Sequence, residues 1–359
     1  MSAEQPQSAK HCVYVANSES QDISVFMLHR DGRLESSSLV PIQRPAVKGK
    51  SVVLALSPKH DFLYASYGNE GAPPTVVSHR IDPESGIPTA FSSTPLGDSV
   101  AYLATDRAGH YLLGASYAGA KVMVHPIELD GSVGAVQQIV TTEPRAHCIL
   151  TDPGNRHVLH TSLGGDLIYQ ESFNPTTGLL TPQEPRAVHV RKGAGPRFMS
   201  FGRIAPVVYV LCELDGAILV LPYDPQRGLL CAPIQTASAL PPQFSGKPWA
   251  ADLHLTPDGR FLFACERTSS VLSAFRGEAE TGILTPIGRY ETVKQPRAFQ
   301  IDPDGRFLVI SGQLATAVIV YSIDGATGAL TASSPYPVGK NPTWVAIASL
   351  APTSQVDGG

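Results

Sequence analysis

Short apolar runs alternate with turn residues along the whole chain, and residues 295–311 (QPRAFQIDPDGRFLVIS) show the unit clearly. One apolar run follows Pro296-Arg297, the turn Asp302-Pro303-Asp304-Gly305 ends it, and a second run extends over 307–310. Proline fixes φ at a turn corner, and aspartate and glycine supply the other conformations that a hairpin turn requires. The pattern predicts two antiparallel strands joined by a tight turn, with the charge of Arg297 at the start of the first strand.

The same unit recurs at nearly constant spacing. The first residues of its turns are Ser57, Asp106, Asp152, Gly202, Thr256 and Asp302, at intervals of 49, 46, 50, 54 and 46 residues. After the second strand, each copy continues with a third apolar strand, such as 120–128 (AKVMVHPIE), and a short fourth strand, such as 328–336 (GALTASSPY). Four antiparallel strands in a repeat of this length are typical of a β-propeller blade.

The two ends of the chain each hold part of a seventh copy. Residues 11–17 (HCVYVAN) match a second strand without a first, and 339–350 (GKNPTWVAIASL) match a first strand without a second. Pairing these two segments would close the ring and leave no sheet edge open. We therefore predict an all-β fold, a seven-bladed β-propeller closed by pairing of the C-terminal strand with the N-terminal blade. One domain would span 11–350, with disordered polar tails at 1–10 and 351–359.

Composition and charge limit the expected partners. The chain has 27 lysines and arginines against 31 acids, without charge blocks, which predicts neither a nucleic-acid nor a membrane partner. The N-terminus lacks the apolar segment of a signal peptide, and no apolar run approaches the roughly 18 residues of a membrane span, so we expect a cytoplasmic protein. A monomer or weak homo-oligomer that binds a small anionic molecule is the expected form.

The five cysteines do not indicate a disulfide framework or a zinc site. Their number is odd, their spacing is wide, four of them lie in apolar runs, and no CxxC pair occurs. A long proline-rich segment, 237–249, is predicted to be a loop, either over a site or as a tolerated insertion. Motifs for a nucleophile elbow, a P-loop, a dinucleotide or an HExxH metal site are lacking, so no cofactor and no metal are predicted.

Candidate chemistry gathers at the starts of first strands, which line the central channel of a propeller and converge there from different blades. Ionisable residues at these starts are Arg145, His147, Arg197, Asp252, His254 and Arg297, and the ends of second strands add Glu213, Asp215, Glu266 and Arg267. Guanidinium groups bind carboxylate or phosphate in a bidentate manner, so three Pro-Arg pairs at equivalent positions favour an anion site.

Each of these residues also has a structural interpretation. A Pro-Arg pair is compatible with a simple strand corner, and Glu213 with a solvated turn acid. His147 alternates with Arg145 on one strand, so both are candidates to point into the channel, although a buried, satisfied histidine is the alternative. For Asp252 and His254, a hydrogen bond that holds the blade together is the favoured interpretation.

Long ordered runs of the chain resemble a known family. The runs GAGPRFMSF (193–201), CELDGAILVLPYD (212–224), KPWAADLHLTPDGRFLFACERTSSVLSAF (247–275) and QPRAFQIDPDGRFLVISGQ (295–313) are similar to those of bacterial seven-bladed propeller 6-phosphogluconolactonases. These are similar in turn to fungal 3-carboxy-cis,cis-muconate lactonizing enzyme. The resemblance covers residues 11–348 and is strongest from 193 onward.

The resemblance implies a catalytic set of a histidine, two arginines and a glutamate at the channel mouth. Position by position, these fall on His147, Arg197, Glu213 and Arg297. The chain departs from the family where it reads PRAHCIL instead of a Gly-Cys-His-Ser or Pro-His-Ser-like segment, and where Phe198 replaces a frequent histidine. Substrate-binding candidates beyond that set are Arg145, Asp252, His254 and Arg267.

The implied activity is hydrolysis of a sugar-acid lactone, most directly 6-phospho-D-glucono-1,5-lactone of the oxidative pentose phosphate route. Arginines would bind the anion and stabilise the oxyanion, while Glu213 or His147 would accept the proton of water. The sequence does not assign these two roles. A lactonizing or lactone-opening enzyme for a carboxylated, muconate-like compound, a metal-dependent propeller lactonase and a non-catalytic propeller scaffold are the alternatives.

Overall fold

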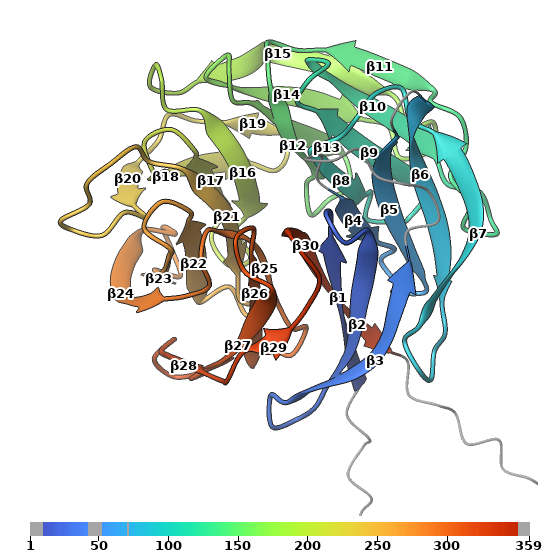
Figure 1. Ribbon diagram of the computed structural model, residues 1–359. Coiled ribbons are helices and arrows are strands. Elements are labelled where there is room, and N and C mark those ends of the chain that lie inside the picture. Colours follow the sequence, from blue (N-terminus) through green and yellow to red (C-terminus); the bar gives the residue numbers. More distant parts are fainter. Residues whose placement is uncertain (1–9, 42–51, 70–71, 351–359) are drawn as a thin grey trace, which may run out of the picture.

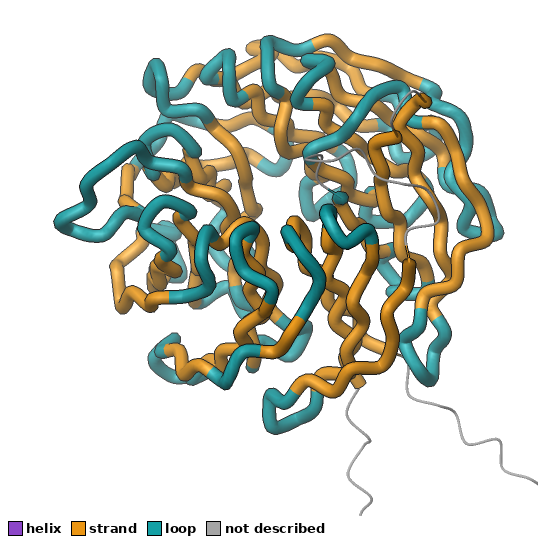
Figure 2. Tube along the Cα trace, viewed as in Figure 1, coloured by secondary structure: helices purple, strands orange, loops and turns teal. Residues whose placement is uncertain are grey.

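The computed structural model describes residues 10–41, 52–69 and 72–350. Within these ranges the chain forms thirty strands and no helix, as the strand and loop colouring of Figure 2 shows. The strands make seven separate sheets arranged as a ring around a central channel (Figure 1). The predicted all-β, seven-bladed propeller is thus confirmed.

Each blade is an antiparallel sheet that runs from the channel outward. The innermost strands are β4 (Val53–Leu56), β8 (Tyr102–Thr105), β12 (Ala146–Thr151), β16 (Pro196–Phe201), β21 (Ala250–Leu255), β25 (Pro296–Ile301) and β30 (Pro342–Leu350). The second strands are β5 (Phe62–Asn69), β9 (Tyr111–Ser116), β13 (His157–Ser162), β17 (Val207–Cys212), β22 (Phe261–Glu266), β26 (Phe307–Gly312) and β1 (Lys10–Asn17).

The two outer layers complete the blades. The third strands are β6 (Ala72–Ile81), β10 (Lys121–Pro126), β14 (Leu167–Phe173), β18 (Ala217–Asp224), β23 (Val271–Gly277), β27 (Ala317–Ile323) and β2 (Asp22–Leu28). The outermost strands are β7 (Pro88–Pro95), β11 (Gln138–Thr141), β15 (Leu180–His189), β19 (Leu229–Leu230) with β20 (Gln235–Ser238), β24 (Leu284–Glu291), β28 (Leu330–Ala332) with β29 (Tyr336–Pro337), and β3 (Leu34–Pro41).

The ring closes through its two chain ends, as the repeat count predicted. β30 pairs antiparallel with β1 from Lys10↔Leu350 to Asn17↔Pro342, so the closing blade has the order β3-β2-β1-β30 (Figure 1). Lys10 is therefore the first residue of a strand. The expected tails at 1–9 and 351–359 lie outside the described residues. No helix in the described part of the chain is long and apolar enough to cross a membrane.

Burial follows the position of each strand in its blade. The second strands are almost wholly buried, whereas outermost strands such as β7 alternate exposed and covered residues along their length. Apolar side chains from adjacent blades pack together; Val13 and Val345 of the closing blade, for example, share a cluster with Val309 and Val320 of its neighbour. Burial of this apolar surface between blades is the main stabilising contribution to the ring.

Candidate active site

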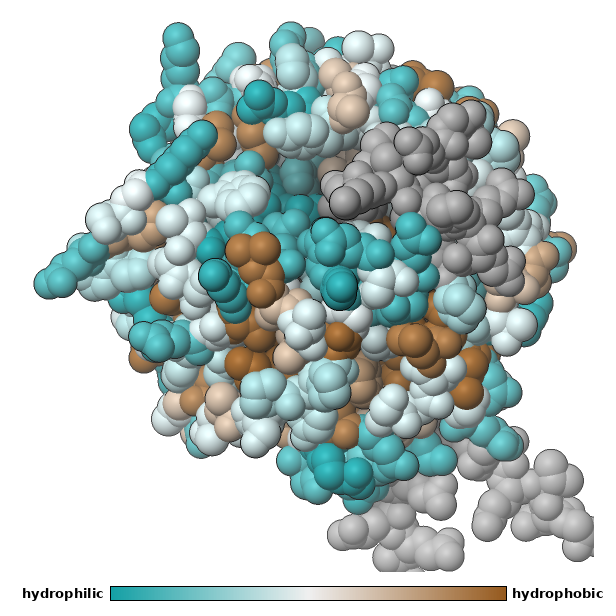
Figure 3. All heavy atoms as spheres, viewed as in Figure 1, coloured by the Kyte–Doolittle hydropathy of each residue, from teal (hydrophilic) through white to brown (hydrophobic). Residues whose placement is uncertain are grey.

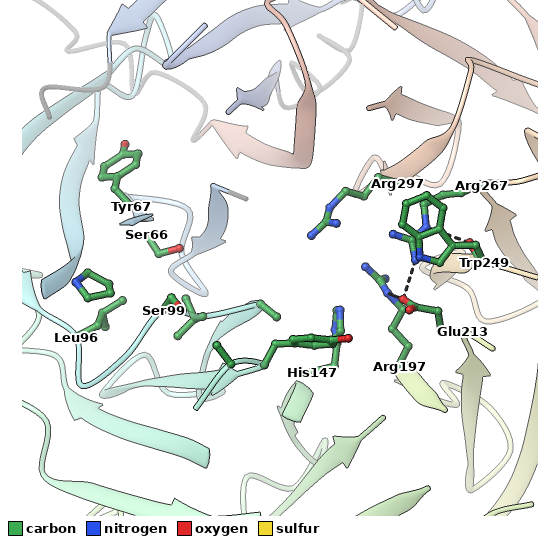
Figure 4. A pocket seen from close by; sticks show the side chains of 15 residues that line it. Ser66, Tyr67, Leu96, Ser99, His147, Arg197, Glu213, Trp249, Arg267 and Arg297 are labelled. Carbon is green, nitrogen blue, oxygen red and sulfur yellow. Dashed lines mark hydrogen bonds and ion pairs between the residues drawn. The ribbon is translucent and has the colours of Figure 1, made fainter. Parts of the chain in front are cut away.

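A cavity of about 350 Å³ lies where the inner strands begin. Its lining residues are Ser66, Tyr67, Pro74, Leu96, Ser99, Val100, Ala101, Tyr117, Ala118, His147, Arg197, Glu213, Trp249, Arg267 and Arg297. They belong to several blades and meet in the middle of the ring (Figure 4). On the face drawn in Figure 3, hydrophilic residues gather around a hollow near the centre. Both the position and the size suit one small molecule.

β-Bulges direct the arginines into this cavity. In β16 the pairing passes from Pro196↔Cys212 to Phe198↔Leu211, which leaves Arg197 as the extra residue. β25 repeats this pattern, and Arg297 is its extra residue. A bulge adds one residue to a strand and re-aims its side chain, so an arginine can turn to the channel while the apolar residues on either side keep their places between the blades.

Glu213 holds two of the arginines in place. Its Oε2 accepts hydrogen bonds from Nε of Arg197 at 2.8 Å and from Nη2 of Arg267 at 2.7 Å (dashed lines in Figure 4). Arg197 also donates through Nη1 to the carbonyl of Ala251, and Arg267 donates through Nε to the carbonyl of Trp249 at 3.0 Å. Both arginine side chains are 2% exposed, and these contacts fix the orientation of their guanidinium groups before any ligand arrives.

Arg297 differs from the other two arginines. Within the described residues its guanidinium makes no hydrogen bond or ion pair, and it points toward the middle of the cavity (Figure 4). Burial, followed by the neighbouring charges of Arg197 and Arg267, lowers its pKa to about 9. That value is above neutral pH, so Arg297 is a charged donor that has no partner among the residues the structure describes.

His147 faces the arginines from β12. It is 4% exposed, and its ring lies 5.4 Å from that of Phe198 and 6.1 Å from that of Tyr117, measured between centroids. Burial and the charges of Arg197, Arg297 and Arg267 hold its pKa well below the usual 6.5. The imidazole is therefore neutral at neutral pH and able to accept a proton.

The cavity carries a surplus of positive charge. Three guanidinium groups and one carboxylate are among its lining residues, which leaves two positive charges in excess. Buried arginines without matching acids are costly unless an anion offsets them. The arrangement can therefore bind a dianion and polarise a carbonyl group beside a neutral base.

The other predicted residues lie outside this lining. Arg145 precedes β12, has a positive φ of 65° and is exposed, with its guanidinium 5.9 Å from the ring centroid of Tyr117. Unlike His147, it is not one of the residues that line the cavity. Asp252 and His254 contact each other, Nε2 to Oδ1 at 3.1 Å, and Asp252 also accepts a hydrogen bond from the Phe299 amide of the next blade. Through Asp252 the pair is joined to the next blade.

Comparison with known proteins identifies the family of this chain. A family model described as "Lactonase, 7-bladed beta-propeller" matches residues 12–347. The chain belongs to this propeller lactonase family. A 6-phosphogluconolactonase of Serratia proteamaculans is 38% identical over 341 residues, which cover 94% of this chain and 99% of the relative. A 6-phosphogluconolactonase of Sodalis glossinidius is 37% identical and covers 82% of this chain and 85% of its own.

Solved structures show the same propeller. The periplasmic gluconolactonase of Pseudomonas aeruginosa matches this lactonase with a TM-score of 0.84 at 25% identity, over 96% of this chain and all of that one. A Bacteroides fragilis protein matches with a TM-score of 0.86 at 24% identity, over 97% of this chain and all of its own, and that likeness shows the fold alone.

The structure of this lactonase adds residues to the site that the sequence did not single out. Trp249 is the last residue of the predicted loop at 237–249, and its ring stacks against Arg267. The guanidinium carbon of Arg267 lies 3.9 Å from the ring centroid of Trp249. Tyr67 and Tyr117 stand at the ends of second strands, where only charged residues had been considered. Their place at the end of a second strand, which Glu213 and Arg267 share, was the signal that could have identified them.

A metal ion would find few ligands in the cavity of this lactonase. Among the described lining residues, Glu213 and His147 are the side chains with the chemistry of good metal ligands. Oε2 of Glu213 already accepts two arginine hydrogen bonds, and the surplus positive charge would oppose a cation. The cavity is thus suited to an anion.

Proposed function

We propose that this lactonase hydrolyses 6-phospho-D-glucono-1,5-lactone to 6-phosphogluconate. The observation that carries the proposal is the cavity's excess of two positive charges. The guanidinium of Arg297, which has no bonded partner among the described residues, lies beside a neutral His147. A phosphate monoester carries about −1.5 to −2 charges at pH 7, which matches this excess. The names of the relatives from Serratia proteamaculans and Sodalis glossinidius support the same substrate.

In this mechanism Arg297 binds the phosphate of the substrate, since no described residue accepts a hydrogen bond from its guanidinium. Arg197 stabilises the oxyanion that forms at the lactone carbonyl, because its Nη2 makes no hydrogen bond among the described residues. A preorganised donor at the developing negative charge is commonly the largest single contribution to such a reaction.

His147 accepts a proton from water as the water oxygen adds to the carbonyl carbon. The resulting imidazolium gives that proton to the ring oxygen as the C–O bond breaks, which yields the open acid. Glu213 acts through the arginines that it orients and is a positioning residue in this scheme. The scheme thus assigns proton transfer to His147, the choice that the sequence left open.

The proposal includes a cytoplasmic location and a monomeric or weakly associated state. All five cysteines are unpaired, and four of them are buried, which suits a reducing compartment. Gel filtration of the purified protein and fractionation of cells would test these two points directly.

A pH-stat assay with freshly prepared 6-phosphogluconolactone tests the function. The expected result is acid release well above the spontaneous rate, with kcat reduced by about 10²–10⁴-fold in His147→Gln. Arg276→Ala is the matched control, since this exposed arginine lies on β23, away from the cavity. A rate no higher than spontaneous hydrolysis, for this lactone and for glucono-1,5-lactone and muconate lactones, would exclude the proposal.

A further inference from the structure

Three potential metal ligands converge where the last blade meets the closing blade. His11 of β1 places its Nε2 3.0 Å from Oδ2 of Asp304 and 3.7 Å from Oδ2 of Asp302. All three ligand atoms lie within 4.8 Å of one another. Asp302 and Asp304 belong to the turn between β25 and β26, so the cluster joins segments 293 residues apart.

Asp302 differs from the equivalent aspartates of two other blades, Asp106 and Asp152, in the contacts of its second carboxylate oxygen. Oδ1 accepts the amides of Arg306 and Phe307, as the equivalent oxygens of Asp106 and Asp152 do in their own turns. The second oxygens of those two aspartates also have partners. Oδ2 of Asp106 accepts a hydrogen bond from the side-chain amide of Asn155 at 2.8 Å, and Oδ2 of Asp152 lies 3.5 Å from Nδ1 of His157.

Oδ2 of Asp302 has no hydrogen-bond partner within the described part of the chain, and the side chain is 1% exposed. Buried polar atoms are nearly always satisfied, so an orphan in this position indicates a missing partner such as a bound ion.

The surroundings of His11 favour a cation at Nε2. Its Nδ1 lies 3.2 Å from the hydroxyl of Ser349 on β30, in the paired strand. If Nδ1 donates to that hydroxyl, Nε2 presents a lone pair toward two carboxylate oxygens. Three acceptors then face one point, which is favourable only if positive charge lies between them.

We propose that His11, Asp302 and Asp304 bind one divalent transition-metal ion of the zinc type. One imidazole nitrogen and two carboxylate oxygens suit such an ion. Tetrahedral ligands at about 2.1 Å from zinc would be roughly 3.4 Å apart, and the observed 3.0 and 3.7 Å lie on either side of that value. The Asp304 side chain is 43% exposed, which leaves a route for the ion and a coordination position for water.

The ion would fasten the ring where the chain ends meet. It would tie β1, which pairs with the C-terminal strand β30, to the turn of the adjacent blade. The cluster lies at the end of β25 opposite Arg297, roughly 17 Å away at the rise of an extended strand. We therefore expect it to act on stability and not on the lactonase reaction, and it does not depend on the proposed function.

The sequence predicted no metal site, because His11 and Asp304 are 293 residues apart in the chain. Only the pairing of β1 with β30 brings His11 beside the turn at Asp302. No local motif could have indicated the cluster.

The test uses the full-length protein, stripped of metal with a chelator and then titrated with Zn²⁺. We expect one ion per chain by calorimetry and a rise in melting temperature of a few degrees at saturating Zn²⁺. Asp304→Asn and His11→Gln should weaken this binding by about tenfold or more and remove the rise in melting temperature.

Two controls separate the site from general metal binding. Asp258→Asn changes the equivalent aspartate of another blade's turn, and His29→Gln removes an exposed histidine that also lies beside a carboxylate. Both should behave like the unmodified protein. If Zn²⁺ leaves the melting temperature unchanged, or shifts it equally in Asp304→Asn and the controls, the proposal is wrong and the three residues form an ion-paired contact only.

Discussion

Replacing Arg297 by alanine is the sharpest test of how the cavity recognises its substrate. The change removes the one cavity arginine whose guanidinium has no hydrogen bond or ion pair within the described residues. No described residue loses a bonded partner, so the fold should tolerate the change. If Arg297 binds the phosphate, the loss should appear with 6-phosphogluconolactone and be nearly absent with glucono-1,5-lactone, which lacks that phosphate.

The size of the effect follows from the kind of bond removed. A hydrogen bond to a charged group contributes about 1.5–3 kcal/mol. At about 1.4 kcal/mol for each factor of ten, kcat/KM for the phosphorylated lactone should fall roughly 10- to 150-fold. Arg297→Lys keeps a charge without the bidentate geometry and should recover part of the loss.

The assay is the pH-stat measurement of both lactones for the unmodified enzyme, Arg297→Ala, Arg297→Lys and Arg276→Ala. The exposed control Arg276→Ala should match the unmodified enzyme with both substrates. Equal losses for the two lactones would refute phosphate recognition and place Arg297 at the reacting carbonyl. Unchanged kinetics with both substrates would show that Arg297 does not bind the phosphate.

Four further predictions follow from other contacts. Glu213→Ala should lower the free energy of unfolding by about 3–5 kcal/mol in urea denaturation, because buried Arg197 loses its carboxylate; no loss would contradict the pairing. Because the pKa of His147 is lowered, kcat/KM for glucono-1,5-lactone should stay level as pH falls from 7.5 to 6.5 and decline only well below 6.5, and an apparent pKa of 6.5 or higher would contradict a neutral base. 6-Phosphogluconate should change the fluorescence of Trp249, which lies in the cavity, and Trp249→Phe should abolish that signal. Ending the chain before Pro342 should yield aggregated protein in gel filtration, since β1 loses its partner strand; a soluble, cooperatively unfolding product would refute the closure.

The same lowered pKa gives a stability prediction with a definite sign. In the unfolded chain His147 would titrate near 6.5, so the unfolded state binds more protons than the folded state below that pH. The contribution is fully present above about 6.5 and is lost as pH falls through that value toward the lower folded pKa. His147→Gln should therefore reduce the loss of stability between pH 7 and 5, and an identical loss in both proteins would contradict the assignment.

The sequence by itself determined the ring. Short apolar runs and the turns between them are local signals, and their recurrence about every fifty residues indicated the blade and the number of blades. The incomplete copies at 11–17 and 339–350 even predicted the pairing of β1 with β30. Each strand and turn depends on neighbouring residues, and the pairing of the chain ends follows from the count of copies, so both can be inferred without knowledge of side-chain contacts.

Only the tertiary structure decided which side chains meet. Simple alternation along a strand predicted that Arg145 and His147 point to the same side. A bulge in β12 and the positive φ of Arg145 break that alternation. One added residue in a strand changes the side to which the following side chains point. Several charges also find their partners across blades: Glu213, in the same blade as Arg197, joins it to Arg267 of the next blade. His11 reaches Asp302 of the neighbouring blade, whereas Arg297 has no hydrogen bond or ion pair within the described residues. Ring closure brings these residues together across tens to hundreds of positions, and no local pattern records that geometry.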